Sequence, residues 1–204
     1  MSDSNGKTSH FPDAADDSPA WEPAPTHVAE LAASCARFVF SKYKVPLDGT
    51  SDTLSLVDQY VKDARAEIKA KPETLELLSA TVGAYLGEVM RRAFGGEWFA
   101  EGDYDAWRLD MTRVFLTFNP LGMAREALLL DEQDGWHAHL EMDDAEKDEI
   151  DRRLAALGEM EEDEYFLPST RFDVVSLAVE ALRGKMIEDG HADVTFSRDD
   201  YRKK

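Results

Sequence analysis

The sequence predicts a single α+β domain in which five or six helices surround a small antiparallel sheet. Long stretches carry apolar residues at intervals of three and four, which is typical of amphipathic helices. Shorter aromatic or β-branched runs near residues 97–118 and 136–142 lie between turn residues, which is typical of antiparallel strands. With 204 residues, of which 43% are hydrophobic, the chain is large and apolar enough to bury one core.

The composition divides the chain into a domain and two tails. Residues 1–25 are rich in Ser, Asp, Pro and Ala and are predicted to be a disordered acidic tail. The globular domain is predicted over 26–190, and a C-terminal tail with a short strand at 194–196 over 191–204. The first residues contain no apolar signal segment, and no stretch approaches the ~20 apolar residues of a membrane span. We therefore expect a cytoplasmic protein that does not insert into membranes.

Three helices are predicted before the first strand. The first runs from a capping Thr26 to about Tyr43 and buries the only cysteine, Cys35, as a small hydrophobe. The second follows a cap at Ser51 or Asp52 and has one narrow apolar stripe that ends near residue 68. The third has Pro72 in its first turn and ends at the glycines 95–96.

Strands and helices alternate in the second half. Candidate strands span 97–100, 106–111 and 113–118, and Asn119 followed by Pro120 predicts a helix over 121–130. A fourth strand is predicted at 136–142. Asp143 and Glu146 resemble a capping box, opening a helix that ends at Gly158. Ser169 or Thr170 can cap the last long helix, whose wide apolar face is either core or a dimer seam, so a homo-oligomer is possible.

Two glycines interrupt the third predicted helix at positions four residues apart, Gly83 and Gly87. Each costs about 0.5–1 kcal/mol relative to alanine in a helix interior. Because residues four apart share one side of a helix, the pair predicts that another backbone or a large aromatic side chain approaches there. A ligand groove is the alternative interpretation.

The same helix carries a short motif. Its residues are Tyr85-Leu86-Gly87-Glu88, then Arg91-Arg92, then Gly95-Gly96-Glu97-Trp98. Glu88 and Arg92 are oriented for an i, i+4 ion pair. The segment 81–98 resembles small uncharacterised bacterial globular domains that carry a Tyr-Leu-Gly-Glu helix and a Gly-Gly-x-Trp exit into a strand. Some domains of that kind lie beside secreted toxins as immunity proteins, so the resemblance implies an immunity role as one possibility and supplies no catalytic residue.

Alternation in the predicted fourth strand places three possible metal ligands on one face, His137, His139 and Glu141. They suggest a metal-dependent enzyme as an alternative function, although polar residues on alternate positions are also what a solvent-facing strand displays. The sequence contains no Gly-x-Ser-x-Gly or His-Glu-x-x-His motif. We predict no cofactor and favour a non-catalytic function.

Residues 131–164 contain fifteen acidic and three basic side chains, which is most of the formal net charge of -19. In the helix predicted there, Asp143 can pair with Lys147, Asp148 with Arg152 and Glu149 with Arg153. The loop at 159–164 has no base. Its five acids are therefore the predicted partner-binding residues, and they are Glu159, Glu161, Glu162, Asp163 and Glu164.

This charge predicts the class of partner. A negative electrostatic field attracts basic proteins and repels nucleic acid phosphates, and the strength of both effects depends on ionic strength. We therefore expect an adaptor, inhibitor or immunity protein that binds a basic protein surface and does not bind nucleic acid directly.

Overall fold

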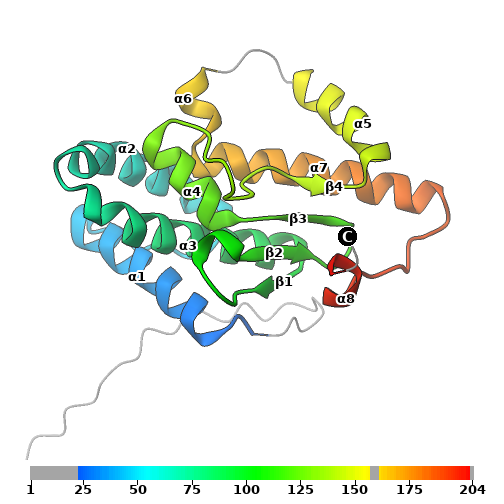
Figure 1. The fold of residues 1–204 in the computed structure, drawn as a ribbon, viewed down its shortest axis with the longest axis horizontal. Helices are drawn as coiled ribbons and strands as arrows, with labels where there is room; N and C mark the ends of the chain where they lie inside the picture. The colour runs from blue at the N-terminus through cyan, green and yellow to red at the C-terminus, as the bar shows by residue number, and fades with distance from the viewer. Residues whose placement is uncertain (1–22, 157–160, 203–204) are drawn as a thin grey trace, which may run out of the picture.

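Four short antiparallel strands form a sheet that pairs in the order of the chain, as the computed structural model shows (Figure 1). The structure describes residues 23–156 and 161–202. Among them, the sheet and eight α-helices form one α+β domain, as predicted. The strands are β1 (Gly96–Phe99), β2 (Arg108–Met111), β3 (Leu116–Phe118) and β4 (Glu141–Met142).

Six long helices and two four-residue helices complete the described part of the chain, and the two short ones explain the excess over the predicted five or six. The helices are α1 (Thr26–Tyr43), α2 (Leu54–Ala70), α3 (Leu75–Phe94), α4 (Pro120–Leu129), α5 (Asp144–Ala155), α6 (Glu162–Tyr165), α7 (Pro168–Glu188) and α8 (Arg198–Tyr201). No helix of the described ranges is long and apolar enough to cross a membrane.

Helix α3 is the centre of the core. Every residue from 78 to 91 is buried, because α1 and α4 pack on it and strands β1 and β2 contact it. A helix that is covered all round in this way is a core helix. The apolar face of α7 is also core, since Val174, Val175 and Ala178 are buried within the chain.

The glycine pair of α3 marks two close approaches, which confirms the packing interpretation. A Cβ on Gly83 would lie 2.4 Å from the Cα of Leu121, so the backbone of α4 passes directly over this glycine. A Cβ on Gly87 would lie 2.3 Å from Cζ2 of Trp98. Both approaches are closer than a side chain permits, which explains why α3 contains glycine in its interior.

The residues that carry the Tyr-Leu-Gly-Glu motif are buried and hydrogen-bonded. Glu88 binds Arg91 through two hydrogen bonds of 2.8 and 3.0 Å, and its Oε1 accepts a third, of 2.8 Å, from Nε1 of Trp98. The predicted partner Arg92 lies farther away, at 3.9 Å. The hydroxyl of Tyr85 accepts a 3.0 Å hydrogen bond from the amide of Gly49. The motif therefore joins α3 to β1 and to the loop before α2.

Several helix starts differ from the sequence prediction. Thr26 does not cap α1, which Pro25 precedes, and the residues 51–53 form a short 3₁₀ turn before α2. Helix α7 begins at Pro168 and is capped from another helix, since Asp58 of α2 accepts hydrogen bonds of 3.0 and 2.5 Å from the amide and hydroxyl of Ser169. Asn119 caps α4 with its own side chain, as predicted.

The C-terminal segment contacts the sheet through Phe196 and Tyr201. The strand predicted at 194–196 does not form; the amide of Phe196 instead donates one 2.8 Å hydrogen bond to the carbonyl of Thr112. Ser197 and Asp200 form a capping box that starts α8. The hydroxyl of Tyr201 then lies at the turn between β2 and β3, within 2.6 Å of the carbonyl oxygen of Met111 and 3.1 Å of the amide of Leu116.

Candidate functional site

One face of the sheet carries a row of polar side chains that crosses all four strands. Register places Glu97 opposite Asp110, Asp110 opposite Thr117 and Thr117 opposite Glu141. Because side chains alternate along a strand, these four residues share one face. The opposite face is apolar and buried, with Leu109, Met111, Leu116 and Phe118. The sheet therefore presents one polar surface, which we call the polar row.

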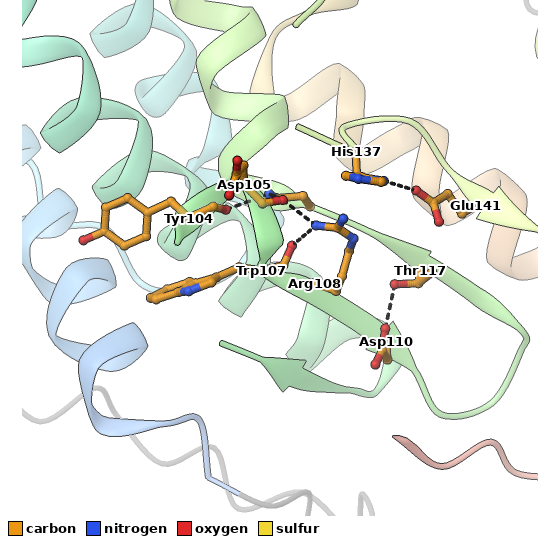
Figure 2. A network of polar contacts seen from close by, with 9 residues as sticks. Tyr104, Asp105, Trp107, Arg108, Asp110, Thr117, His137 and Glu141 are labelled. Atoms are coloured by element: carbon orange, nitrogen blue, oxygen red, sulfur yellow. Dashed lines mark hydrogen bonds and ion pairs between the residues drawn. The ribbon is translucent and has the colours of Figure 1, made fainter. Parts of the chain in front are cut away.

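Asp110 is the most enclosed member of the row, with 7% of its surface exposed. The hydroxyl of Thr117 donates a 2.6 Å hydrogen bond to its Oδ1 (Figure 2). Burial raises the pKa of Asp110, and it outweighs the hydrogen bond from Thr117 and the positive charges of Arg198 and Arg108, which act in the other direction. Asp110 thus holds a proton more readily than an ordinary aspartate does.

Two arginines flank the polar row. Nη1 of Arg108 donates 2.7 Å hydrogen bonds to the carbonyl oxygens of Asp105 and Trp107, which fixes the preceding turn against the sheet (Figure 2). Burial lowers the pKa of the Arg108 guanidinium, although the nearby carboxylate of Glu141 opposes that effect. On the β1 side, Arg198 of α8 donates a 2.8 Å hydrogen bond to the carbonyl of Trp98.

The structure brings together two of the three predicted metal ligands. Nδ1 of His137 lies 2.6 Å from Oε1 of Glu141, and both side chains are exposed (Figure 2). His139 is exposed too, and it forms no such pair with any residue that the structure describes. Within residues 23–156 and 161–202, no group of three His, Cys, Asp or Glu side chains is placed to hold a metal ion.

The strand predicted at 136–142 is wrong in length, because only Glu141 and Met142 pair with β3. The backbone of His137 has a φ of 50°, which is left-handed and interrupts the extended conformation. Burial still alternates along the segment, with Ala138 buried between exposed histidines. The alternation of polar and apolar residues thus correctly predicted which side chains face the core, but it did not predict how far the segment pairs with β3.

Within the described residues, the predicted partner-binding acids lie in α6 and directly before it. Glu161, Asp163 and Glu164 are exposed. The loop prediction is wrong from residue 162 onward, because 162–165 form α6. Glu159 lies outside the described residues, as do residues 1–22 of the predicted acidic tail, Leu157 and Gly158.

Of the ion pairs predicted in α5, the one between Glu149 and Arg153 is confirmed, and the pairing of Arg152 differs. Arg152 and Arg153 both bind Glu149, the second at 2.8 Å, so the predicted pair between Asp148 and Arg152 does not form. The two arginines hold the pKa of Glu149 below its usual value. Glu146 lies 2.6 Å from Nζ of Lys185 in α7. This last contact fastens α5 to α7.

Sequence reasoning missed the residues that the fold brings together from distant positions. Glu126 of α4 is fully buried and lies 2.6 Å from the guanidinium of Arg171 in α7, which is also buried. The only sequence signal for this pair is a carboxylate within the apolar run 121–130. The members of the polar row are ordinary strand residues, and their register alone makes them neighbours.

Searches against known proteins do not place the chain in a family. No protein-family model, curated protein or solved structure matches it. A functional proposal therefore rests on the residues of this chain.

Proposed function

We propose that this protein is a cytoplasmic, non-catalytic binding protein whose acidic region engages a basic surface of a partner protein, as an adaptor, inhibitor or immunity protein does. The acidic region is defined by exposed carboxylates of α5, of α6 with its preceding residue, and of the loop after α4. They are Asp131, Glu132, Asp134, Asp144, Asp148, Asp151, Glu161, Asp163 and Glu164. These elements lie along one edge of the molecule (Figure 1).

The ion pairing of α5 carries the proposal. Both of its arginines are engaged by a single acid, Glu149, and Glu146 is neutralised by Lys185. Within the described part of the chain, Asp144, Asp148 and Asp151 are left exposed without an ion pair. The charge of α5 is therefore not neutralised within the helix, and its outer side adds to the acids near α6.

The acidic region acts on a partner through its negative electrostatic field. Exposed like charges raise the local concentration of a basic protein and accelerate its association, and salt weakens this effect because the screening length is about 10 Å at 0.1 M ionic strength. The same field opposes the approach of a nucleic acid phosphate backbone. A basic protein surface is the partner that this charge favours.

The test begins with the partner and then measures its affinity. The full chain is used to capture proteins from extract of its native host at low ionic strength, and a captured basic protein is identified by mass spectrometry and purified. Titration calorimetry at rising NaCl then measures its Kd. We expect binding to weaken about tenfold or more between low and physiological salt. An affinity independent of NaCl contradicts the proposal.

A matched pair of variants separates local charge from total charge. Asp144→Asn, Asp148→Asn and Asp151→Asn together neutralise the outer side of α5, whereas Glu30→Gln, Glu67→Gln and Asp193→Asn neutralise three exposed acids elsewhere. The first set is expected to weaken binding severalfold more than the second. Equal effects of the two sets mean that the acidic region is not the binding surface.

A further inference from the structure

A groove runs between α5 and the C-terminal half of α7, which lie side by side (Figure 1). Its larger chamber has a volume of about 520 Å³, and a smaller chamber of about 170 Å³ adjoins it. The two chambers share Glu146, Leu182, Lys185 and Asp189 as lining residues, so they are parts of one groove. Gly184 lines the larger chamber, and a Cβ built on it meets no atom within 4 Å.

The smaller chamber is lined by four apolar residues and by five polar or charged ones, Asp143, Glu146, Lys185, Asp189 and His191. Phe115 and Phe196 line it together with Leu182 and Met186. The two phenylalanine rings meet edge to face with their centroids 5.6 Å apart, which stiffens this end of the groove. A closed apolar cavity of about 150 Å³ holds a benzene ring, so this chamber has room for one apolar side chain.

The larger chamber has a charged rim with an excess of acid. Its carboxylates are Glu146, Glu149, Glu180, Glu188 and Asp189, and its bases are Arg152, Arg153 and Lys185. Two of these acids already bind the three bases. Glu188 and Asp189 are exposed and form no ion pair within the described residues. The rim therefore favours positive charge in whatever enters the groove.

The ion pair of Lys185 with Glu146 crosses the groove where the chambers meet. Half of the Lys185 side chain is exposed, and surface pairs of this kind contribute little to stability. An arginine can form two parallel hydrogen bonds with a carboxylate, whereas lysine presents a single point charge. An arginine in the groove can thus compete with Lys185 for Glu146.

We propose that this groove binds a basic peptide segment of the partner, with one apolar side chain in the smaller chamber and arginine or lysine side chains on the acidic rim. The inference rests on the proposed function, because it names the partner chemistry that the acidic region attracts. Charge complementarity at the rim and the four apolar residues of the smaller chamber together favour this occupant over an acidic or a wholly apolar one.

The first experiment uses defined probes. Fluorescence anisotropy measures binding of the full chain to a fluorescein-labelled peptide of alternating arginine and alanine with one central leucine. We expect this peptide to bind about tenfold more tightly than its central Leu→Ala version, because the apolar anchor is lost. A version with glutamate for arginine is expected not to bind. No binding of the leucine peptide, or equal binding of all three, overturns the proposal.

The second experiment blocks the groove without removing a charge. Gly184→Phe places a ring in the open space of the larger chamber, and Gly184→Ala is the matched control that leaves it open. Gly184→Phe is expected to weaken peptide binding about tenfold or more, while Gly184→Ala leaves the Kd unchanged. Circular dichroism and urea unfolding verify that both variants fold. Wild-type affinity in a folded Gly184→Phe variant overturns the proposal.

Failure of the groove can be told from failure of the proposed function. Asp144, Asp148 and Asp151 do not line the groove. If their neutralisation weakens binding of the purified partner and Gly184→Phe does not, the acidic region binds the partner and the groove inference is wrong. If the Kd for the partner changes neither with NaCl nor with these three substitutions, the proposed function itself is wrong.

Discussion

Nε1 of Trp98 donates a 2.8 Å hydrogen bond to Oε1 of Glu88, through the space that Gly87 leaves on the surface of α3. The contact joins the central helix to the first strand, because Trp98 lies in β1 on the face opposite the polar row. Glu88 is in turn held by Arg91. The position of the sheet on α3 therefore depends on this cluster.

Gly87→Ala is expected to destabilise the protein by about 1–3 kcal/mol, because the added methyl group overlaps the indole of Trp98. In the Trp98→Phe background, which lacks the overlapping part of the ring, the same substitution should cost less. Gly184→Ala is the control, since its methyl group enters open space and the gain in helix propensity should stabilise by about 0.5–1 kcal/mol. Urea unfolding measures the stability of wild type, Gly87→Ala, Trp98→Phe, their double variant and Gly184→Ala. A Gly87→Ala protein as stable as wild type contradicts this account.

The buried ion pair of Glu126 with Arg171 predicts a strong coupling between two helices. Arg171→Met leaves the Glu126 carboxylate buried without its counter-charge, and we expect a loss of about 3–5 kcal/mol. Adding Glu126→Met removes that carboxylate, so the double variant should be more stable than Arg171→Met alone. A double-mutant cycle by urea unfolding measures the coupling. Additive effects would show that the pair does not act as a unit.

Asp110 predicts a pH dependence of stability. Its pKa is raised in the folded protein above the ordinary value of 3.8, so the native state binds this proton more tightly than the unfolded chain does. Its contribution to stability is present at pH below 3.8 and is lost as the pH rises through the folded pKa. In Asp110→Asn the side chain does not ionise, so this loss of stability with rising pH does not occur. The amide oxygen can still accept the hydrogen bond from Thr117.

The free energies of unfolding of wild type and Asp110→Asn should therefore diverge as the pH rises above the ordinary aspartate pKa of 3.8, with the variant gaining relative to wild type. Urea unfolding at several pH values provides the measurement. Asp193→Asn, the loss of an exposed acid in a loop, controls for the change in net charge. A difference between wild type and Asp110→Asn that stays constant with pH would mean that Asp110 titrates alike in both states.

Tyr201→Phe tests whether α8 holds the turn between β2 and β3. The substitution removes the hydroxyl that accepts from the amide of Leu116 and lies 2.6 Å from the Met111 carbonyl, while the ring still stacks on Phe115. We expect a loss of about 1–3 kcal/mol and faster hydrogen exchange at the Leu116 amide. Tyr60→Phe is the control, because that hydroxyl makes no hydrogen bond within the described residues. Unchanged exchange at Leu116 would show that the turn does not depend on α8.

Local pattern was enough to predict the helices that carry the core. The predicted first helix begins within one residue of α1 and ends with it at Tyr43, and the apolar stripe of the second matches the buried apolar residues of α2. The glycine spacing in α3 correctly predicted close packing, because four residues make slightly more than one helical turn and so return to the same side. These features depend only on residues near one another in the chain.

The candidate site depended on contacts between distant residues. Glu97, Asp110, Thr117 and Glu141 form a row only because three strand pairings have one particular register. The partners of the α5 acids changed for a similar reason, since Lys185 of α7 reached Glu146 and Arg152 turned to Glu149. A side chain's choice among several nearby partners is settled by geometry that spacing alone does not supply.

The sequence by itself determined the fold class, the excess of acid between residues 131 and 164, and the glycines that α3 needs, because periodicity, charge and backbone freedom are local properties. Tertiary structure decided which polar groups meet. It placed Glu126 against Arg171 across 45 positions, capped α7 with Asp58, and opened a groove between α5 and α7. Those contacts form when packing brings distant segments together. Burial then makes the loss of either partner of a charge pair costly to stability.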